Sequence, residues 1–274
     1  MKRSRKKQWI INICAIALAL LFLFPIYVMV LSSFKPNNEI FNMSLIPDFS
    51  TLTLDNFRQV MANGSFFQSM LNSFIIAATI TIAALLFHSM AGFALAKLKF
   101  PGKRFVFCWF MSTMMIPFAV IMIPLFSIVK GMGLLNTLWA VILPLLPNAY
   151  GIFLYRQFFM DIPDSLLEAA RIDGLSNFQI FWKIYRPLST PITITLGITF
   201  FVTNWNTYLW PLIVTQRQDL WVVQVAMANF KQEHTTAWNL ILAGAVIAAL
   251  PTVILFFLFQ NYIKDGIKTA GMKE

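Results

Sequence analysis

The chain has 274 residues, of which 58% are hydrophobic and 12% charged, and its formal net charge is +10. A soluble domain usually carries about twice this charged fraction, so the composition excludes an ordinary soluble enzyme or binding domain. The apolar residues are gathered into long blocks, which predicts an all-α membrane protein.

Six apolar stretches follow one another along the sequence, and none of them contains Asp or Glu. Each has about the 20 residues that a helix needs to cross a hydrocarbon core about 30 Å thick. Backbone polar groups in lipid must be satisfied within each segment, so each stretch is expected to be a helix. The six expected spans, which make 1–274 one transmembrane domain, are 9–31, 73–96, 105–129, 138–159, 192–214 and 238–259.

The basic residues predict the orientation of these spans. Of the 21 Lys and Arg, five fall in the loops of one side and the others fall in the opposite loops and at the two termini. Basic residues gather on the cytoplasmic side, so both termini are expected to be cytoplasmic. The basic N-terminus is therefore a topology signal and not a nucleic-acid site. The five outer residues are Lys35, Arg58, Lys130, Arg217 and Lys231.

Proline occurs inside most of the expected spans, where it removes a backbone donor and kinks a helix. Two interpretations stay open, since kinked helices could line a translocation pathway or could be ordinary features of a membrane bundle. The prolines are Pro25, Pro117, Pro124, Pro144, Pro147, Pro211 and Pro251.

A polar segment, residues 160–188, separates the fourth and fifth spans and has the signals of two short helices. Asp161 is expected to cap the first helix, with Pro163 and Asp164 in its first turn. Gly174 is expected to end that helix in the left-handed conformation.

The second helix of the segment is predicted to begin at a capping box formed by Ser176 and Gln179 and to end at Pro187. Two short helices joined by a glycine turn would form a rigid projection to which another protein can dock. The alternative is an amphipathic loop that lies on the lipid headgroups.

The turn between the two helices offers the chemistry of a protein contact. Glu168, Arg171 and Asp173 can form charged contacts, while Ala169 and Ala170 keep one face small enough for close approach. These residues and Gly174 are the candidate docking site.

The order of residues in this segment resembles the EAA loop of ABC importer permeases. The resemblance is carried by Glu168-Ala169-Ala170, Asp173-Gly174 and Ile184-Tyr185-Arg186-Pro187-Leu188. Arg186 stands where the family usually has leucine, but the following proline is in place. Further segments resemble the carbohydrate branch of the family, the maltose and glycerol-phosphate type, so that the resemblance covers essentially the whole chain: 33–37, Asn72-Ser73, 205–212 and 266–271.

The resemblance implies a type I ABC importer permease fold in a bacterial cell membrane. The partners it implies are a second, homologous permease, two ATP-binding cassette subunits and an extracytoplasmic sugar-binding protein. Residues 160–188 would then be the coupling loop that enters the ATPase. The sequence contains no Walker-type phosphate loop, so this chain is expected to bind no cofactor and to be no enzyme, with ATP and Mg²⁺ on the partner ATPase.

Three other functions remain as alternatives. An ion-coupled secondary transporter is the main one, but the spans lack the buried Asp, Glu or Lys that proton relays use. A sodium-coupled carrier could rely on backbone carbonyls alone. A membrane-embedded enzyme would need paired carboxylates or a metal cluster, and a purely structural subunit would not need the projection.

A sugar path needs amides for hydroxyl groups and aromatic faces for the apolar side of the ring. Four residues near the outer end of the fifth span, with Asn148 in the fourth, are the candidates for it. The alternative for the aromatic ones is a belt at the membrane interface. The four residues are Asn204, Trp205, Asn206 and Tyr208.

Overall fold

The computed structural model describes residues 5–41, 49–62, 64–230 and 236–271, and within these ranges every regular element is a helix. This confirms the prediction of an all-α protein. Lys231 lies outside the described residues. The chain divides into two compact units, Met1–Phe67 with Ala226–Leu250 and Gln68–Val225 with Pro251–Glu274.

The first unit is organised around the buried side chain of Asn56. Its amide donates to the carbonyl oxygens of Ser33 and Lys35, each at 2.8 Å, and its Oδ1 accepts from Asn239 at 2.8 Å. Three segments far apart in sequence are thus joined by one amide. The elements of this unit are α1 (Arg5–Ser33), η1 (Asn37–Glu39), α2 (Asp55–Ala62), the start of α3 (Gly64–Lys97) and the first part of α14 (Trp238–Gly271).

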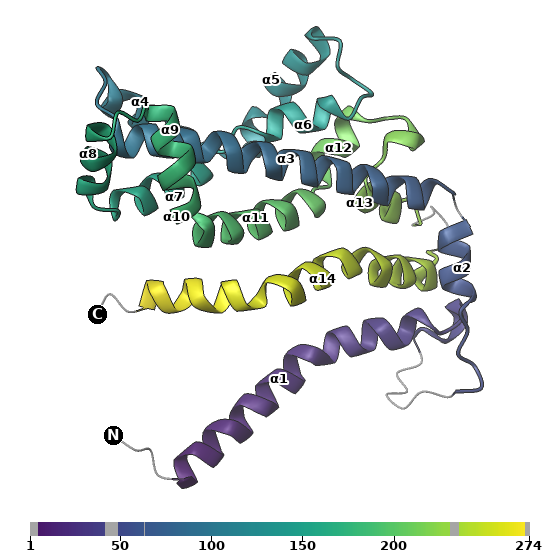
Figure 1. Cartoon of the computed structure of the whole chain (residues 1–274). Helices are drawn as coiled ribbons and strands as arrows, with labels where there is room; N and C mark the ends of the chain where they lie inside the picture. The colour runs from purple at the N-terminus through teal and green to yellow at the C-terminus, as the bar shows by residue number, and fades with distance from the viewer. Residues whose placement is uncertain (1–4, 42–48, 63, 231–235, 272–274) are drawn as a thin grey trace. The chain divides into compact units, whose positions relative to one another are not determined.

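The second unit holds the rest of α3 and the shorter helices (Figure 1). Two clusters of buried side chains lie along α3, one around Ile76 and Trp210 and the other around Phe93 and Tyr185. The further elements of this unit are α4 (Lys103–Thr113), α5 (Phe118–Gly131), α6 (Trp139–Leu145), α7 (Ala149–Met160), α8 (Asp164–Ile172), α9 (Asn177–Ile180), η2 (Phe181–Tyr185), α10 (Arg186–Leu188), α11 (Thr190–Trp205), α12 (Leu209–Val214), η3 (Gln218–Leu220) and the start of α13 (Val223–Ala228).

Three of the six predicted spans are single long helices in the described part of the chain. They are Gln8–Ser33, Gly64–Lys97 and Trp238–Gln260, and each is long and apolar enough to cross a membrane. A fourth candidate is the pair α4 and α5, which is bent by 102°. The bend has a local cause: α4 ends at Thr113, turn-type bonds continue to Ile116, and Pro117, which has no N–H, is the extended residue before α5.

The predicted spans 138–159 and 192–214 are each divided into two helices. Between α6 and α7, Pro147 supplies no N–H, and the side chain of Asn148 accepts from the N–H groups of Tyr150 and Gly151 to begin a new helix. At the end of α11, the side-chain amide and the backbone N–H of Asn206 both donate to the Val202 carbonyl, at 2.8 and 3.1 Å, before the chain continues into α12.

Candidate functional site

The segment 160–188, called the coupling loop from here on after the role that the resemblance implies, has α8 as its first helix. Pro163 is the extended N-cap residue of α8, and its side chain makes no cap bond. The N-cap residue is therefore Pro163 and not the predicted Asp161, which lies two residues earlier. Asp164 does lie in the first turn, as predicted, where the helix dipole favours a carboxylate.

Lys97, the last residue of α3, fixes the start of α8. Its ammonium group donates to the carbonyl oxygen of Ile162 at 2.6 Å and forms an ion pair with the Asp164 carboxylate. The Lys97 side chain is 5% exposed and that of Asp164 is 74% exposed, so water and salt reach this ion pair from the carboxylate side. The bond from Lys97 and its charge hold the pKa of Asp164 below its usual value.

Gly174 ends α8 as predicted, with a φ of +77°. The Leu175 N–H donates to the Ala170 carbonyl at 3.0 Å, and the Gly174 N–H donates to the Arg171 carbonyl at 3.0 Å. These two bonds form a Schellman motif, which satisfies carbonyls that the helix end would leave open. Leu175 then packs against the buried cluster of the loop, so the turn is held by apolar contact as well as by its hydrogen bonds.

The second helix starts at the predicted capping box. The Gln179 N–H donates to the Ser176 hydroxyl at 3.3 Å, and the Gln179 side chain accepts from the Ser176 N–H at 2.9 Å. The end expected at Pro187 falls one residue later: the chain passes from α9 through the π-helical turn η2 into α10, which ends at Leu188 before α11 begins at Thr190.

The candidate docking residues divide into two sets on α8. Ala170 is buried with Leu167, while Glu168, Ala169 and Arg171 are exposed. Asp173 and Gly174 are exposed as well. The two alanines therefore differ in place: Ala170 packs onto the protein, and Ala169 keeps the outward face small beside the charges.

An aromatic cluster fills the space between α8 and α9 and the ends of α3 and α7. Phe93 of α3 lies 4.8 Å from Tyr185, and Phe159 of α7 lies 5.7 Å from the same ring, measured between ring centroids. Phe181 lies 5.7 Å from Phe93. Aromatic pairs at these separations add to the stability gained from burial. The coupling loop is consequently a rigid part of the unit, packed on the ends of α3 and α7.

A cavity of about 520 Å³ lies among α3, α6, α7 and α11. Of the predicted path residues, Asn148 and Asn204 line it, together with Tyr150, Thr199 and Thr203. Asn204 donates to the Phe200 carbonyl at 2.8 Å, and Asn148 accepts the two capping bonds of α7. The cavity thus combines amides, hydroxyls and the aromatic rings of Tyr150 and Phe200.

The other three predicted path residues lie elsewhere in the same region. Trp205 is buried and stacks on Phe201 at 5.8 Å between ring centroids. Asn206 is exposed and accepts from the Gln224 amide at 3.2 Å. Tyr208 is exposed and precedes α12. None of the three lines the described cavity.

Two residues of the site, Lys97 and His88, have partners that the local sequence pattern does not indicate. Lys97 ends an apolar span, where a basic residue is ordinary, and its partner Asp164 is 67 residues away. His88 lies between the Leu146 carbonyl at 3.2 Å and the Asn148 N–H at 3.3 Å, beside the break between α6 and α7. These are long-range pairings, which local pattern cannot supply.

A helical membrane protein with a rigid, exposed two-helix loop and a partly polar cavity among its helices has the features of a transport subunit. The sequence matches the family described as "Binding-protein-dependent transport system inner membrane component" over residues 88–269. The chain belongs to this family. It is an ABC transporter permease, which is a transport subunit and not an enzyme.

Similar proteins agree over nearly the full chain. The arabinooligosaccharides transport system permease protein AraQ of Halalkalibacterium halodurans is 36% identical, with 99% of each chain covered. The sn-glycerol-3-phosphate transport system permease protein UgpE of Salmonella typhi is 33% identical, with 89% of this chain and 90% of the relative covered. No ion-coupled carrier is among these relatives.

A solved structure shares the fold. It is a bacterial ABC transporter involved in the import of the acidic polysaccharide alginate, and it superposes with a TM-score of 0.81 at 24% identity. The match covers 96% of this chain and 99% of that chain.

Proposed function

We propose that this chain is one of two unlike permeases of an importer for a sugar or oligosaccharide, delivered by an extracytoplasmic binding protein. Two ATP-binding cassette subunits bind ATP and Mg²⁺ and power the cycle, while this chain binds no cofactor. The proposal is supported by the family and by relatives whose names specify arabinooligosaccharides and glycerol phosphate.

The coupling role of 160–188 is supported by one observation above all. Its α8 is held from inside by Leu167, Ala170 and the Lys97 ammonium, while Glu168 and Arg171 are left exposed. A projection with a charged surface and a well-packed base can dock to the ATPase and pass the movement of the ATPase on to the spans. ATP binding closes the ATPase pair, the coupling loop moves with it, and the spans change from inward-facing to outward-facing.

The membrane topology proposed is six crossings with both termini in the cytoplasm. Three crossings are the long helices α1, α3 and α14, and the other three are the divided pairs α4 with α5, α6 with α7 and α11 with α12. The basic residues of the loops support this orientation.

The proposed substrate path passes the cavity that Asn148 and Asn204 line. Its hydroxyls and amides can bond to sugar hydroxyls, and the exposed Tyr150 ring can cover the apolar face of a sugar. Asn206 and Tyr208 are not part of the cavity lining, and we place them at the outer entrance of the proposed substrate path.

Affinity purification in mild detergent tests the coupling role. The tagged chain, expressed with its partners, is expected to bring down an ATPase and a second permease. Glu168→Lys reverses a charge on α8 and should lose the ATPase while keeping the second permease. Asp55→Lys, the same change on an exposed residue of α2, is the matched control and should keep both.

Two results would contradict the proposal. A chain that purifies alone and exchanges substrate without any ATPase would support the ion-coupled carrier. Retention of the ATPase by Glu168→Lys at the level of Asp55→Lys would remove this residue from the docking surface.

A further inference from the structure

Helix α3 carries buried polar side chains near both of its ends. Asn72 and Ser73 lie in its first part and are 2% and 1% exposed, and Lys97 at its end is 9% exposed. Buried polar groups cost stability unless they are hydrogen-bonded, so their partners show what each end of α3 holds.

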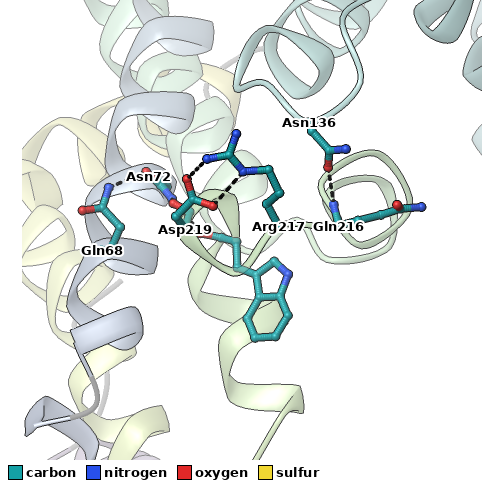
Figure 2. A network of polar contacts seen from close by, with 7 residues as sticks. Gln68, Asn72, Asn136, Gln216, Arg217 and Asp219 are labelled. Carbon is teal, nitrogen blue, oxygen red and sulfur yellow. Dashed lines mark hydrogen bonds and ion pairs between the residues drawn. The ribbon is translucent and has the colours of Figure 1, made fainter.

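At the first end, α3 holds the segment 215–222 between α12 and α13, here called the outer loop. The Asn72 amide donates to the carbonyl oxygens of Asp219 at 2.8 Å and Trp221 at 3.0 Å. The Ser73 hydroxyl accepts from the Val223 N–H at 2.8 Å, directly after the loop. Figure 2 shows Asn72 pointing into this loop beside Asp219.

The Asn72 amide is itself fixed in orientation. Gln68, one turn earlier on α3, donates to its Oδ1 at 3.0 Å, which leaves the NH₂ group aimed at the two loop carbonyls (Figure 2). The loop has two further contacts: Arg217 forms an exposed ion pair with Asp219 inside the loop, and the Gln216 N–H donates to the Asn136 side chain, outside the loop, at 2.7 Å. The outer loop is therefore an ordered body attached to α3.

At the other end, Lys97 holds the coupling loop through the Ile162 carbonyl and the Asp164 carboxylate. Between Asn72 and Lys97 the helix is continuous and contains no proline. A rise of 1.5 Å per residue places the two attachment points about 37 Å apart, which exceeds the hydrocarbon thickness of about 30 Å. In the six-crossing topology proposed above, the two attachments lie on opposite sides of the membrane.

We propose that α3 is a rigid link between the outer loop and the coupling loop, with Asn72, Ser73 and Lys97 as its positioning residues. An event at the outer loop, such as docking of the binding protein, is transmitted along α3 to the ATPase, and ATP-driven movement of the coupling loop returns by the same helix. This inference rests on the proposed function.

A double-mutant cycle tests the link in the complete reconstituted importer. The quantity measured is the ratio of ATPase activity with the sugar-loaded binding protein to the activity without it. Asn72→Leu removes the bonds to the loop carbonyls, and Lys97→Met removes the ammonium at similar length. Each is expected to lower the ratio about fivefold, the lower end of common coupling factors.

The decisive result is the double variant. Changes at distant, independent sites add in free energy, so independent effects would multiply the two losses. If the signal passes along α3, breaking one attachment already interrupts it, and breaking the other changes the ATPase ratio little further. The double variant should then have the same ratio as the single variant with the lower ratio. Multiplied losses, or unchanged ratios in both single variants, would overturn the inference.

Controls separate the link from general damage. Lys103→Met removes an ammonium that bonds to the Ala96 and Leu98 carbonyls at the end of α3. Lys103 acts on the Asp164 carboxylate only through its charge and not through a hydrogen bond, so this variant should lower the ratio much less than Lys97→Met. Lys97→Arg retains the charge and should restore most of the ratio. Should Asn72→Leu fail to assemble, Gln68→Leu removes only the bond that orients Asn72 and should give an intermediate ratio.

The wild-type importer shows whether a negative result concerns the proposed function or only the α3 link. If the wild-type importer shows no stimulation by any sugar-binding protein, the proposed function fails and the link fails with it. If the wild type is stimulated and the losses multiply, only the link is wrong.

Discussion

Gly174 determines the path of the coupling loop from a single pair of backbone angles. Its φ of +77° lets the Leu175 N–H turn back to the Ala170 carbonyl, which directs the chain toward the second helix. A Cβ built on Gly174 would meet no atom within 4 Å. The demand for glycine is therefore one of backbone conformation and not of space.

This separation gives a sharp prediction for two substitutions at one site. Gly174→Asn should be tolerated, because asparagine visits the left-handed region, whereas Gly174→Val should cost about 1–2 kcal/mol or more of local strain. Thermal unfolding and recovery of the ATPase measure the two effects. Equal behaviour of the two variants would mean that the turn does not set the geometry of docking.

The two asparagines of the cavity should respond differently to replacement by leucine. The Asn204 bond to Phe200 is local to one helix, so Asn204→Leu should reduce sugar uptake with little loss of stability. Asn148 caps α7, so Asn148→Leu should reduce uptake and also cost about 1 kcal/mol of stability. Uptake by proteoliposomes and thermal unfolding are the measurements.

Asn148→Asp is the matched control for that cap. Aspartate caps a helix as well as asparagine does, so the stability should be retained while the amide donor is lost. Unchanged uptake in all three variants would exclude the cavity from the substrate path.

Single elements were predictable where their signals are local. The capping box at Ser176 and the glycine at the end of α8 are encoded within a few residues, and both predictions are confirmed. The predicted N-cap position at Asp161 lies two residues before the observed one, because Pro163 takes the extended N-cap conformation. The apolar length of 138–159 does not reveal that the segment is divided into two helices. The break occurs because the Asn148 side chain caps α7 and so starts a new helix.

Packing between elements is set by contacts that the sequence does not reveal. Gly92 of α3 faces α7 so closely that a Cβ there would lie 2.6 Å from the Tyr155 Cβ and 2.9 Å from the Arg156 nitrogen. Both obstacles belong to the α7 backbone or its first side-chain atom, so neither can rotate away. Small residues that permit such approach are characteristic of membrane helix interfaces.

Gly92→Ala should consequently push α3 and α7 apart and destabilise the protein by about 1–3 kcal/mol, the usual range for overpacking. Gly197→Ala is the control, because its Cβ would meet only the flexible tip of Leu85 at 3.4 Å. Thermal unfolding in detergent compares the two. Equal midpoints would show that the approach of α3 to α7 is looser than the contacts indicate.

For the whole molecule, composition and apolar blocks predict the helical class, and the EAA-like residues predict the family that the comparisons show. The pairs that hold the molecule together are beyond such reasoning. Asn72 and Asp219 are 147 residues apart, and Lys97 and Asp164 are 67 apart. Each residue has many partners of suitable chemistry along the chain, and only the fold selects one.

The number of crossings is the global property that the bent pair α4 and α5 leaves to experiment. If this pair crosses the membrane, Lys99 and Met132 lie on opposite sides, and the chain crosses six times. Single cysteines at Asn38, Met132 and Gln216 should then react with an impermeant maleimide in intact cells. Cysteines at Lys99 and Lys183 should react only in inside-out vesicles.

The label at position 132 distinguishes a crossing from a re-entrant loop. The bend of 102° between α4 and α5 is equally compatible with a segment that enters and leaves the membrane on one side. Met132 is exposed on the protein, so a failure to react in intact cells would come from its side of the membrane and not from burial. The native Cys14 and Cys108 are also exposed and must first be replaced by alanine. Reaction of position 132 only in inside-out vesicles would make α4 and α5 re-entrant. The orientation of every later element would then be reversed unless one of the pairs α6 with α7 or α11 with α12 were re-entrant too.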